Sequence, residues 1–164
     1  MPVLLIVVVM VGCGGGSTRT ATRVDTHLEV GPPSKTDYIQ LADVICKNHQ
    51  SRREDLESQT INLGRIDSRA KARRVAQLLR LESANLMAEA RELQSRQPPP
   101  ADAGRVASVL ALVRAKAHLI DDWAKAYDDL DTAEIRRLQI RIGLATAKAR
   151  ERAQAYGFEV CGRD

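Results

Sequence analysis

Aromatic residues are scarce in this chain of 164 residues, which has one Trp, one Phe and three Tyr. A hydrophobic core must therefore be built from Leu, Ile, Val and Ala, and a glycan-binding surface, which presents several exposed aromatic rings, is disfavoured. A strong excess of one charge is also missing. The formal net charge is +4, and basic residues alternate with acidic ones. Because a nucleic-acid-binding protein needs a segregated basic face, no nucleic-acid partner is expected.

Catalytic and cofactor motifs are missing as well. The chain has no nucleophile elbow, no phosphate-binding glycine loop and no Ser/His/Asp arrangement. It has no Glu-x-x-His pair for a di-iron site and no C-x-x-C-H for covalent haem. We therefore expect no enzymatic activity and no cofactor.

The N-terminal stretch contains the longest apolar run, from Val3 to Val11. Its length of about nine residues is too short for a membrane span and suits the core of a signal peptide. No Lys or Arg precedes it, so either the true start lies upstream or export tolerates the lack of a positively charged n-region.

The run ends in the stretch Met10, Val11, Gly12 and Cys13. This stretch resembles the lipobox of bacterial prolipoproteins. The resemblance implies that residues 1–12 are a signal peptide, removed before Cys13, and that Cys13 carries the lipid, with palmitate among the expected acyl groups. A secretory signal followed by an incidental cysteine is the alternative.

Two further segments extend this resemblance to small uncharacterised helical lipoproteins of high-GC Gram-positive bacteria: "YIQLADVIC" at 38–46 and "YGFEVCG" at 156–162. The resemblance implies a helical domain on the extracytoplasmic face of the cell membrane, without an assigned activity. Residues 13–33 are rich in Gly, Ser and Thr and predict a flexible linker with a span of about 25 Å. Residues 34–164 are then one domain.

This domain has almost no strand signal, and its apolar residues recur at three- and four-residue steps over four long segments. The segments are about 36–63, 68–97, 102–130 and 131–156. Short connections favour an all-α, antiparallel up-down-up-down four-helix bundle. Two helical hairpins that pair only on dimerisation are the alternative. The expected inward positions of the first helix are Tyr38, Leu41, Ala42, Ile45, Leu56 and Leu63.

With Cys13 assigned to lipid, Cys46 and Cys161 are left as a candidate disulfide. Cys46 lies about 15 Å along the first helix. The short tail after Tyr156 extends about 16 Å, so it can fold back along the bundle to reach Cys46. Cys46 and His49 also form a C-x-x-H pair, to which Cys161 can add a third metal ligand. A structural zinc site needs four ligands, so the disulfide is favoured and no metal is expected.

His49 and His118 define the alternative function, because an antiparallel bundle places them at similar heights. A small-ligand or metal carrier would bind within the bundle near these two side chains. Ala117 occupies the inward position of its helix, however, so His118 is expected to point to a flank, and His49 is expected to be a satisfied core or boundary residue.

Charge is also unevenly distributed at one end of the predicted bundle. Residues 52–74 are mainly basic and residues 121–134 mainly acidic. A bipolar contact surface or a weak calcium site at Asp128, Asp129 and Asp131 is one interpretation. The favoured interpretation is that the basic and acidic segments neutralise each other across neighbouring helices and that Asp131 caps a helix.

The sequence thus predicts a lipid-anchored, extracytoplasmic protein of unknown activity, whose helical bundle serves as an interaction or structural module for a protein of the cell envelope.

Overall fold

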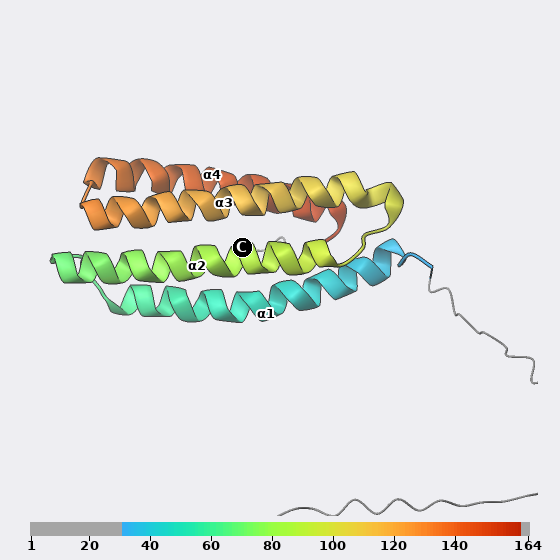
Figure 1. Ribbon diagram of the computed structural model, residues 1–164, viewed down its shortest axis with the longest axis horizontal. Helices are drawn as coiled ribbons and strands as arrows, with labels where there is room; N and C mark the ends of the chain where they lie inside the picture. Colours follow the sequence, from blue (N-terminus) through green and yellow to red (C-terminus); the bar gives the residue numbers. More distant parts are fainter. Residues whose placement is uncertain (1–30, 162–164) are drawn as a thin grey trace, which may run out of the picture.

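The first helix begins where Ser34 and Asp37 cap each other. The Asp37 amide donates to Ser34 Oγ over 3.2 Å, and the Ser34 amide donates to Asp37 Oδ2 over 3.3 Å. This capping box starts α1 (Lys35–Asn62). The computed structural model describes residues 31–161 of the chain (Figure 1). Gly64 follows α1 with φ +61°, a conformation that glycine adopts without steric cost.

Two of the other three helices, α2 and α4, begin at side-chain caps. Ser68 accepts from the Lys71 amide and starts α2 (Arg69–Ser95). The Pro-rich segment ends α2, and a short 3₁₀ turn, η1 (Pro100–Asp102), leads into α3 (Ala103–Asp129). Asp131 accepts from the Glu134 amide and starts α4 (Thr132–Tyr156). The start of each helix lies close to its predicted position.

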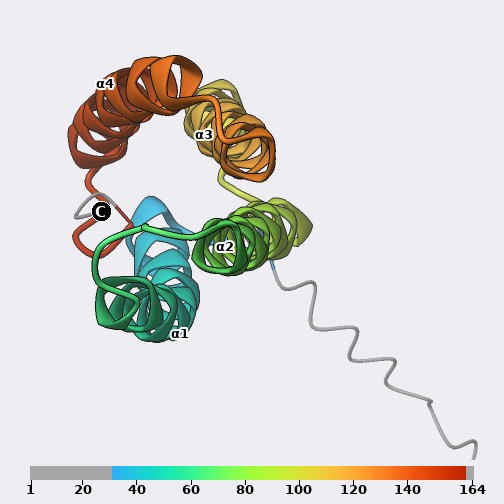
Figure 2. The ribbon, with the colours of Figure 1, turned by 90° about the vertical axis from the view of Figure 1, so that its left-hand side faces the viewer.

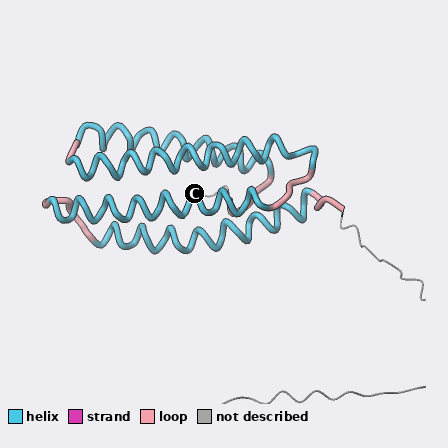
Figure 3. The backbone as a smooth tube through the Cα atoms, viewed as in Figure 1, coloured by secondary structure: helices cyan, strands magenta, loops and turns pink. Residues whose placement is uncertain are grey.

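The four helices run alternately up and down, as the sequence predicts (Figure 1). Within residues 31–161 there is no strand, and loops are confined to the ends of the helices (Figure 3). α1 packs on α2, α2 on α3 and α3 on α4. The α2–α3 interface joins the hairpin of α1 and α2 to the hairpin of α3 and α4. The two hairpins therefore pair within one chain and do not need a second copy.

The bundle is not closed evenly. The helix pairs with extensive contact do not include α1 with α4, and the end-on view shows these two helices as the edges of an open ring (Figure 2). Consequently α4 buries only Leu138, Ala149, Ala153 and Tyr156. Ile135, Ile142 and Ala145, which the apolar spacing of α4 would direct inward, stay partly exposed, because no helix covers them from the α1 side.

The core consists of two clusters along the bundle axis. One, near the chain ends, contains Tyr38, Ile45, Leu93, Val106, Tyr156 and Phe158. The other contains Val75, Leu79, Leu86, Ile120 and Ala124. The prediction for Leu41 was wrong. Its side chain is 41% exposed, whereas the neighbouring Ala42, which was also expected to point inward, is 1% exposed.

The tail after α4 closes the open side at one end. Gly157 has φ +112°, its amide donates to Gln154 O, and the Phe158 amide donates to Ala153 O, which is a Schellman motif. The chain then turns back along α1, where Cys161 forms a disulfide with Cys46. This is the pair that the sequence predicts.

Asp43 holds this tail in place. Its carboxylate accepts backbone hydrogen bonds from Glu159, Val160 and Cys161 at 3.0, 2.9 and 3.2 Å. The sequence analysis did not find this role. It arises because Asp43 lies one turn before Cys46 on α1, and the disulfide brings the tail amides to it.

Candidate functional site

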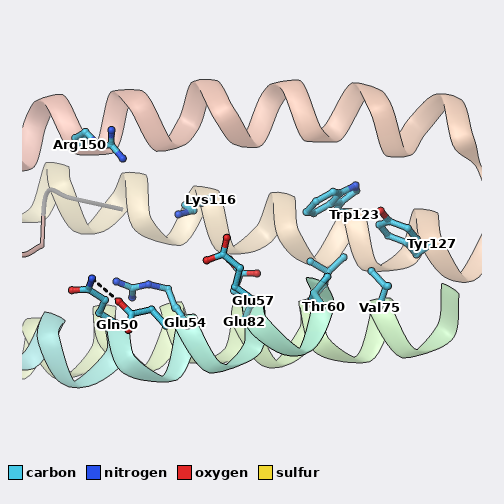
Figure 4. A pocket seen from close by; sticks show the side chains of 12 residues that line it. Gln50, Glu54, Glu57, Thr60, Val75, Glu82, Lys116, Trp123, Tyr127 and Arg150 are labelled. Atoms are coloured by element: carbon cyan, nitrogen blue, oxygen red, sulfur yellow. Dashed lines mark hydrogen bonds between the residues drawn. The ribbon is translucent and has the colours of Figure 1, made fainter. Parts of the chain in front are cut away.

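The open side of the bundle contains a groove of about 460 Å³. Its edges are α1 and α4, and its floor is α2 and α3 (Figure 4). All four helices contribute to the lining, which consists of Gln50, Arg53, Glu54, Glu57, Thr60, Val75, Leu79, Glu82, Lys116, Trp123, Tyr127 and Arg150.

The two edges of the groove carry opposite charge. The α1 edge presents Glu54 and Glu57, together with Arg53, which pairs with the buried Glu89, whereas the α4 edge presents Arg150 (Figure 4). Glu82 and Lys116 lie on the floor between them. An occupant of this groove therefore meets anionic side chains along one edge and a cationic side chain along the other.

One half of the groove has an aromatic wall. The ring centroids of Trp123 and Tyr127 are 5.7 Å apart, and Thr60 and Val75 lie opposite them (Figure 4). Trp123 Nε1 is buried and has no hydrogen-bond partner among the described residues. A buried donor without an acceptor costs free energy, so the aromatic wall contains a polar group that the fold leaves unsatisfied.

Burial governs the charge of Glu82. Loss of solvent raises the pKa of its carboxyl above the ordinary value of 4.5, and the nearby carboxylate of Glu57 raises it further. Lys116 and Arg53 act in the opposite direction, but they do not cancel the effect of burial. The protein around Glu82 therefore disfavours the anionic form of this carboxyl group on the floor of the groove.

Beneath the groove lies a buried ion pair between Arg53 and Glu89. The Glu89 side chain is 6% exposed, and burial raises the pKa of its carboxyl despite the guanidinium beside it. Glu89 Oε1 also contacts the disulfide sulfur of Cys46 at 3.2 Å. A cavity of about 30 Å³ borders this pair, Lys116 and Cys161, so the polar interior extends from the groove to the disulfide.

The two histidines proposed for a carrier site do not come together in this groove. The ring nitrogens of His49 lie 2.9 Å from Asn85 Oδ1 and 3.1 Å from Glu92 Oε2, and Asn85 Nδ2 donates to the His49 carbonyl over 3.0 Å. His49 is therefore a satisfied boundary residue between α1 and α2. His118 is exposed on α3. Neither histidine lines the groove.

Metal-ligand geometry is not found elsewhere in the described part of the chain. Within residues 31–161, no group of three His, Cys, Asp or Glu side chains is placed to hold a metal ion. Of the three aspartates proposed for calcium, Asp131 caps α4 and Asp128 pairs with Arg80 of α2. The expectation was that a basic residue of segment 52–74 would neutralise Asp128. Its partner Arg80 lies outside that segment.

The sequence analysis missed the polar floor. A second row of α2 positions, with steps of three and four residues, runs beside the row of apolar residues and includes Glu82, Asn85 and Glu89. Because α2 is covered by α1 on one side and α3 on the other, both rows face inward, and Asn85 and Glu89 are 4% exposed. Three polar residues in such a second row were the available signal.

The predicted signal peptide 1–12, Cys13 and the linker up to residue 30 lie outside the described residues. In the part of the chain that is described, no helix is sufficiently long and apolar to cross a membrane. Comparison with protein-family models, curated proteins and solved structures finds no match to this chain.

Proposed function

We propose that this protein is a lipid-anchored, extracytoplasmic binding module that holds a segment of another envelope protein in the groove between α1 and α4. One observation carries the proposal: these two helices are bridged by the tail and its disulfide rather than packed along their length. The groove of about 460 Å³ is left open between them.

A protein segment suits this groove because the groove lies between two helices and is open on one side. Recognition of a helix in a groove uses a few anchoring side chains and polar contacts at the rim. Trp123 and Tyr127 supply an aromatic anchor point, since aromatic residues dominate the binding energy of many interfaces. Glu57 and Arg150 on opposite edges supply polarity and hence a preferred orientation of the segment.

Two features support an extracytoplasmic location for this module. The sequence around Cys13 resembles a lipobox, and a disulfide links Cys46 to Cys161. Disulfides persist mainly in oxidising compartments outside the cytoplasm. The lipid on Cys13 would keep the domain at the membrane surface.

Native mass spectrometry tests this proposal on the protein released gently, without chelators, from membranes of cells that make it. We expect a mass that includes a lipid on Cys13, the loss of two hydrogens for one disulfide, and a bound protein. Glu57→Lys reverses a charge at the edge of the groove and is expected to remove the bound protein. Asp55→Lys makes the same change on the opposite side of α1, where the helical spacing directs residue 55 away from residue 57, and is expected to retain it.

Two kinds of result would contradict the proposal or favour the alternative function. Loss of the bound protein in both variants, or in neither, contradicts a role for the groove. A retained small molecule or metal ion in place of a protein would favour the carrier function.

A further inference from the structure

The outward face of α4 carries two adjacent rows of unlike side chains. Ile140 and Leu144, one turn apart, are 61% and 68% exposed. Arg137, Arg141 and Lys148 recur at four and seven residues along the next row, and all three are exposed. At three- and four-residue spacing these rows lie side by side on one face of the helix.

Of the four helices, α4 has the largest net positive charge, with α2 next at +3. α4 contains six Arg or Lys residues and two Glu residues, a net charge of +4, which equals that of the whole chain. Arg137 pairs with Glu134. Arg141 and Lys148, by contrast, have no ion-pair or hydrogen-bond partner among residues 31–161.

We propose that this outward face of α4 lies on the surface of an anionic lipid bilayer. A row of exposed apolar side chains flanked by cations is the arrangement by which helices rest in the headgroup region of membranes. The apolar side chains enter the boundary of the acyl chains, and the cations meet the lipid phosphates. A second copy of α4 is a poor occupant, since two faces of the same positive charge repel each other.

The position of the predicted anchor is compatible with this orientation. The linker leaves the bundle at the start of α1, which is also the end where α4 finishes (Figure 1). Leu144 lies about 18 Å along α4 from that end, and the predicted linker spans about 25 Å. Arg150 lies about 120° around the helix from Leu144, so a domain resting on this face keeps the groove accessible to a partner.

Vesicle co-sedimentation tests the inference separately from both the groove and the lipid. The protein comprises residues 13–164 with Cys13→Ser, so no lipid anchor contributes. It is mixed with vesicles of phosphatidylcholine alone, or of phosphatidylcholine and phosphatidylglycerol in equal amounts. We expect binding to the anionic vesicles only.

Two double variants and a matched control locate the contact. Arg141→Gln with Lys148→Gln is expected to weaken binding about 25-fold, because each cation at an anionic surface contributes about fivefold. Ile140→Ser with Leu144→Ser leaves the charge of α4 unchanged, and it is nevertheless expected to weaken binding, because the apolar side chains no longer enter the boundary of the acyl chains. The control, Arg69→Gln with Arg73→Gln, removes two exposed cations from α2 and is expected to leave binding within about twofold of the starting protein.

Three results would overturn the inference. The first is no binding to anionic vesicles. The second is an equal effect of the α2 control, which would indicate general charge attraction. The third is binding that is insensitive to Ile140→Ser with Leu144→Ser and is abolished equally by soluble polyphosphate, which would indicate a site for polyanions instead of a bilayer.

Discussion

Removal of the Cys46–Cys161 disulfide is expected to destabilise the domain strongly. The bond closes a loop with a sequence separation of 115 residues. In the chain-entropy treatment, a loop of this size restricts the unfolded chain by about 4–5 kcal/mol. Cys46→Ala combined with Cys161→Ser removes the bond and leaves no free thiol at either position.

The expected change in melting temperature follows from the size of the domain. Globular proteins gain about 2.1 cal/mol/K of unfolding entropy per residue, so a domain of about 130 residues gains about 0.27 kcal/mol/K. A loss of 4–5 kcal/mol therefore lowers Tm by about 15–18 °C. Thermal unfolding followed by circular dichroism measures this shift, with Cys13→Ser as the control that removes a cysteine but no disulfide.

A fall in Tm of less than about 3 °C would refute the reasoning. In the double variant, hydrogen exchange at the amides of Glu159, Val160 and Cys161 is also expected to accelerate, because Asp43 alone then holds the tail. Unchanged exchange would show that the tail is held independently of the disulfide.

Three further changes test the polar interior and the tail. Burial raises the pKa values of Glu82 and Glu89 above 4.5, so the folded domain retains protons that the unfolded chain loses. The two carboxyl groups therefore contribute to stability below about pH 4.5, and this contribution is lost as pH rises through the raised pKa values. Replacing Glu82 and Glu89 with Gln should abolish this part of the pH dependence of the free energy of unfolding in urea. Arg53→Met leaves the Glu89 carboxylate buried without its partner and should lower the unfolding free energy by about 3–5 kcal/mol at neutral pH, whereas an unchanged urea midpoint would show that the pair is dispensable. Asp43→Ala deprives three tail amides of their acceptor and should cost about 2 kcal/mol in the same assay, with Asp43→Asn recovering part of it; equal losses in the two variants would contradict the hydrogen-bonding explanation.

The helices could be predicted because their signals are local. Ser34 with Asp37, and Asp131 with Glu134, mark helix starts within one turn of the chain, and Gly157 marks an end. The alternation of up and down follows from the short connections between the helices. The Cys46–Cys161 pair followed from that topology and the reach of the tail.

The open side could not be predicted, because periodicity shows which residues point inward but not how closely the first and last helices approach. The inward residues Ile135, Ile142 and Ala145 of α4 have the spacing of a closed bundle, yet they remain partly exposed. The polar floor was missed for a related reason. Glu82 and Glu89 are ordinary surface residues in a helix with one buried face, and they become interior only when α2 is covered on two sides.

The central claim is that the groove between α1 and α4 holds a segment of another protein, and site-specific photo-crosslinking in cells that make the protein tests it most directly. A photoreactive amino acid at Thr60 reports on the groove, and one at Asp55 reports on the opposite side of α1. We expect a discrete adduct from position 60, mapping to one segment of one partner, and no such adduct from position 55. Equal adducts from both positions, or none from position 60, would contradict the account.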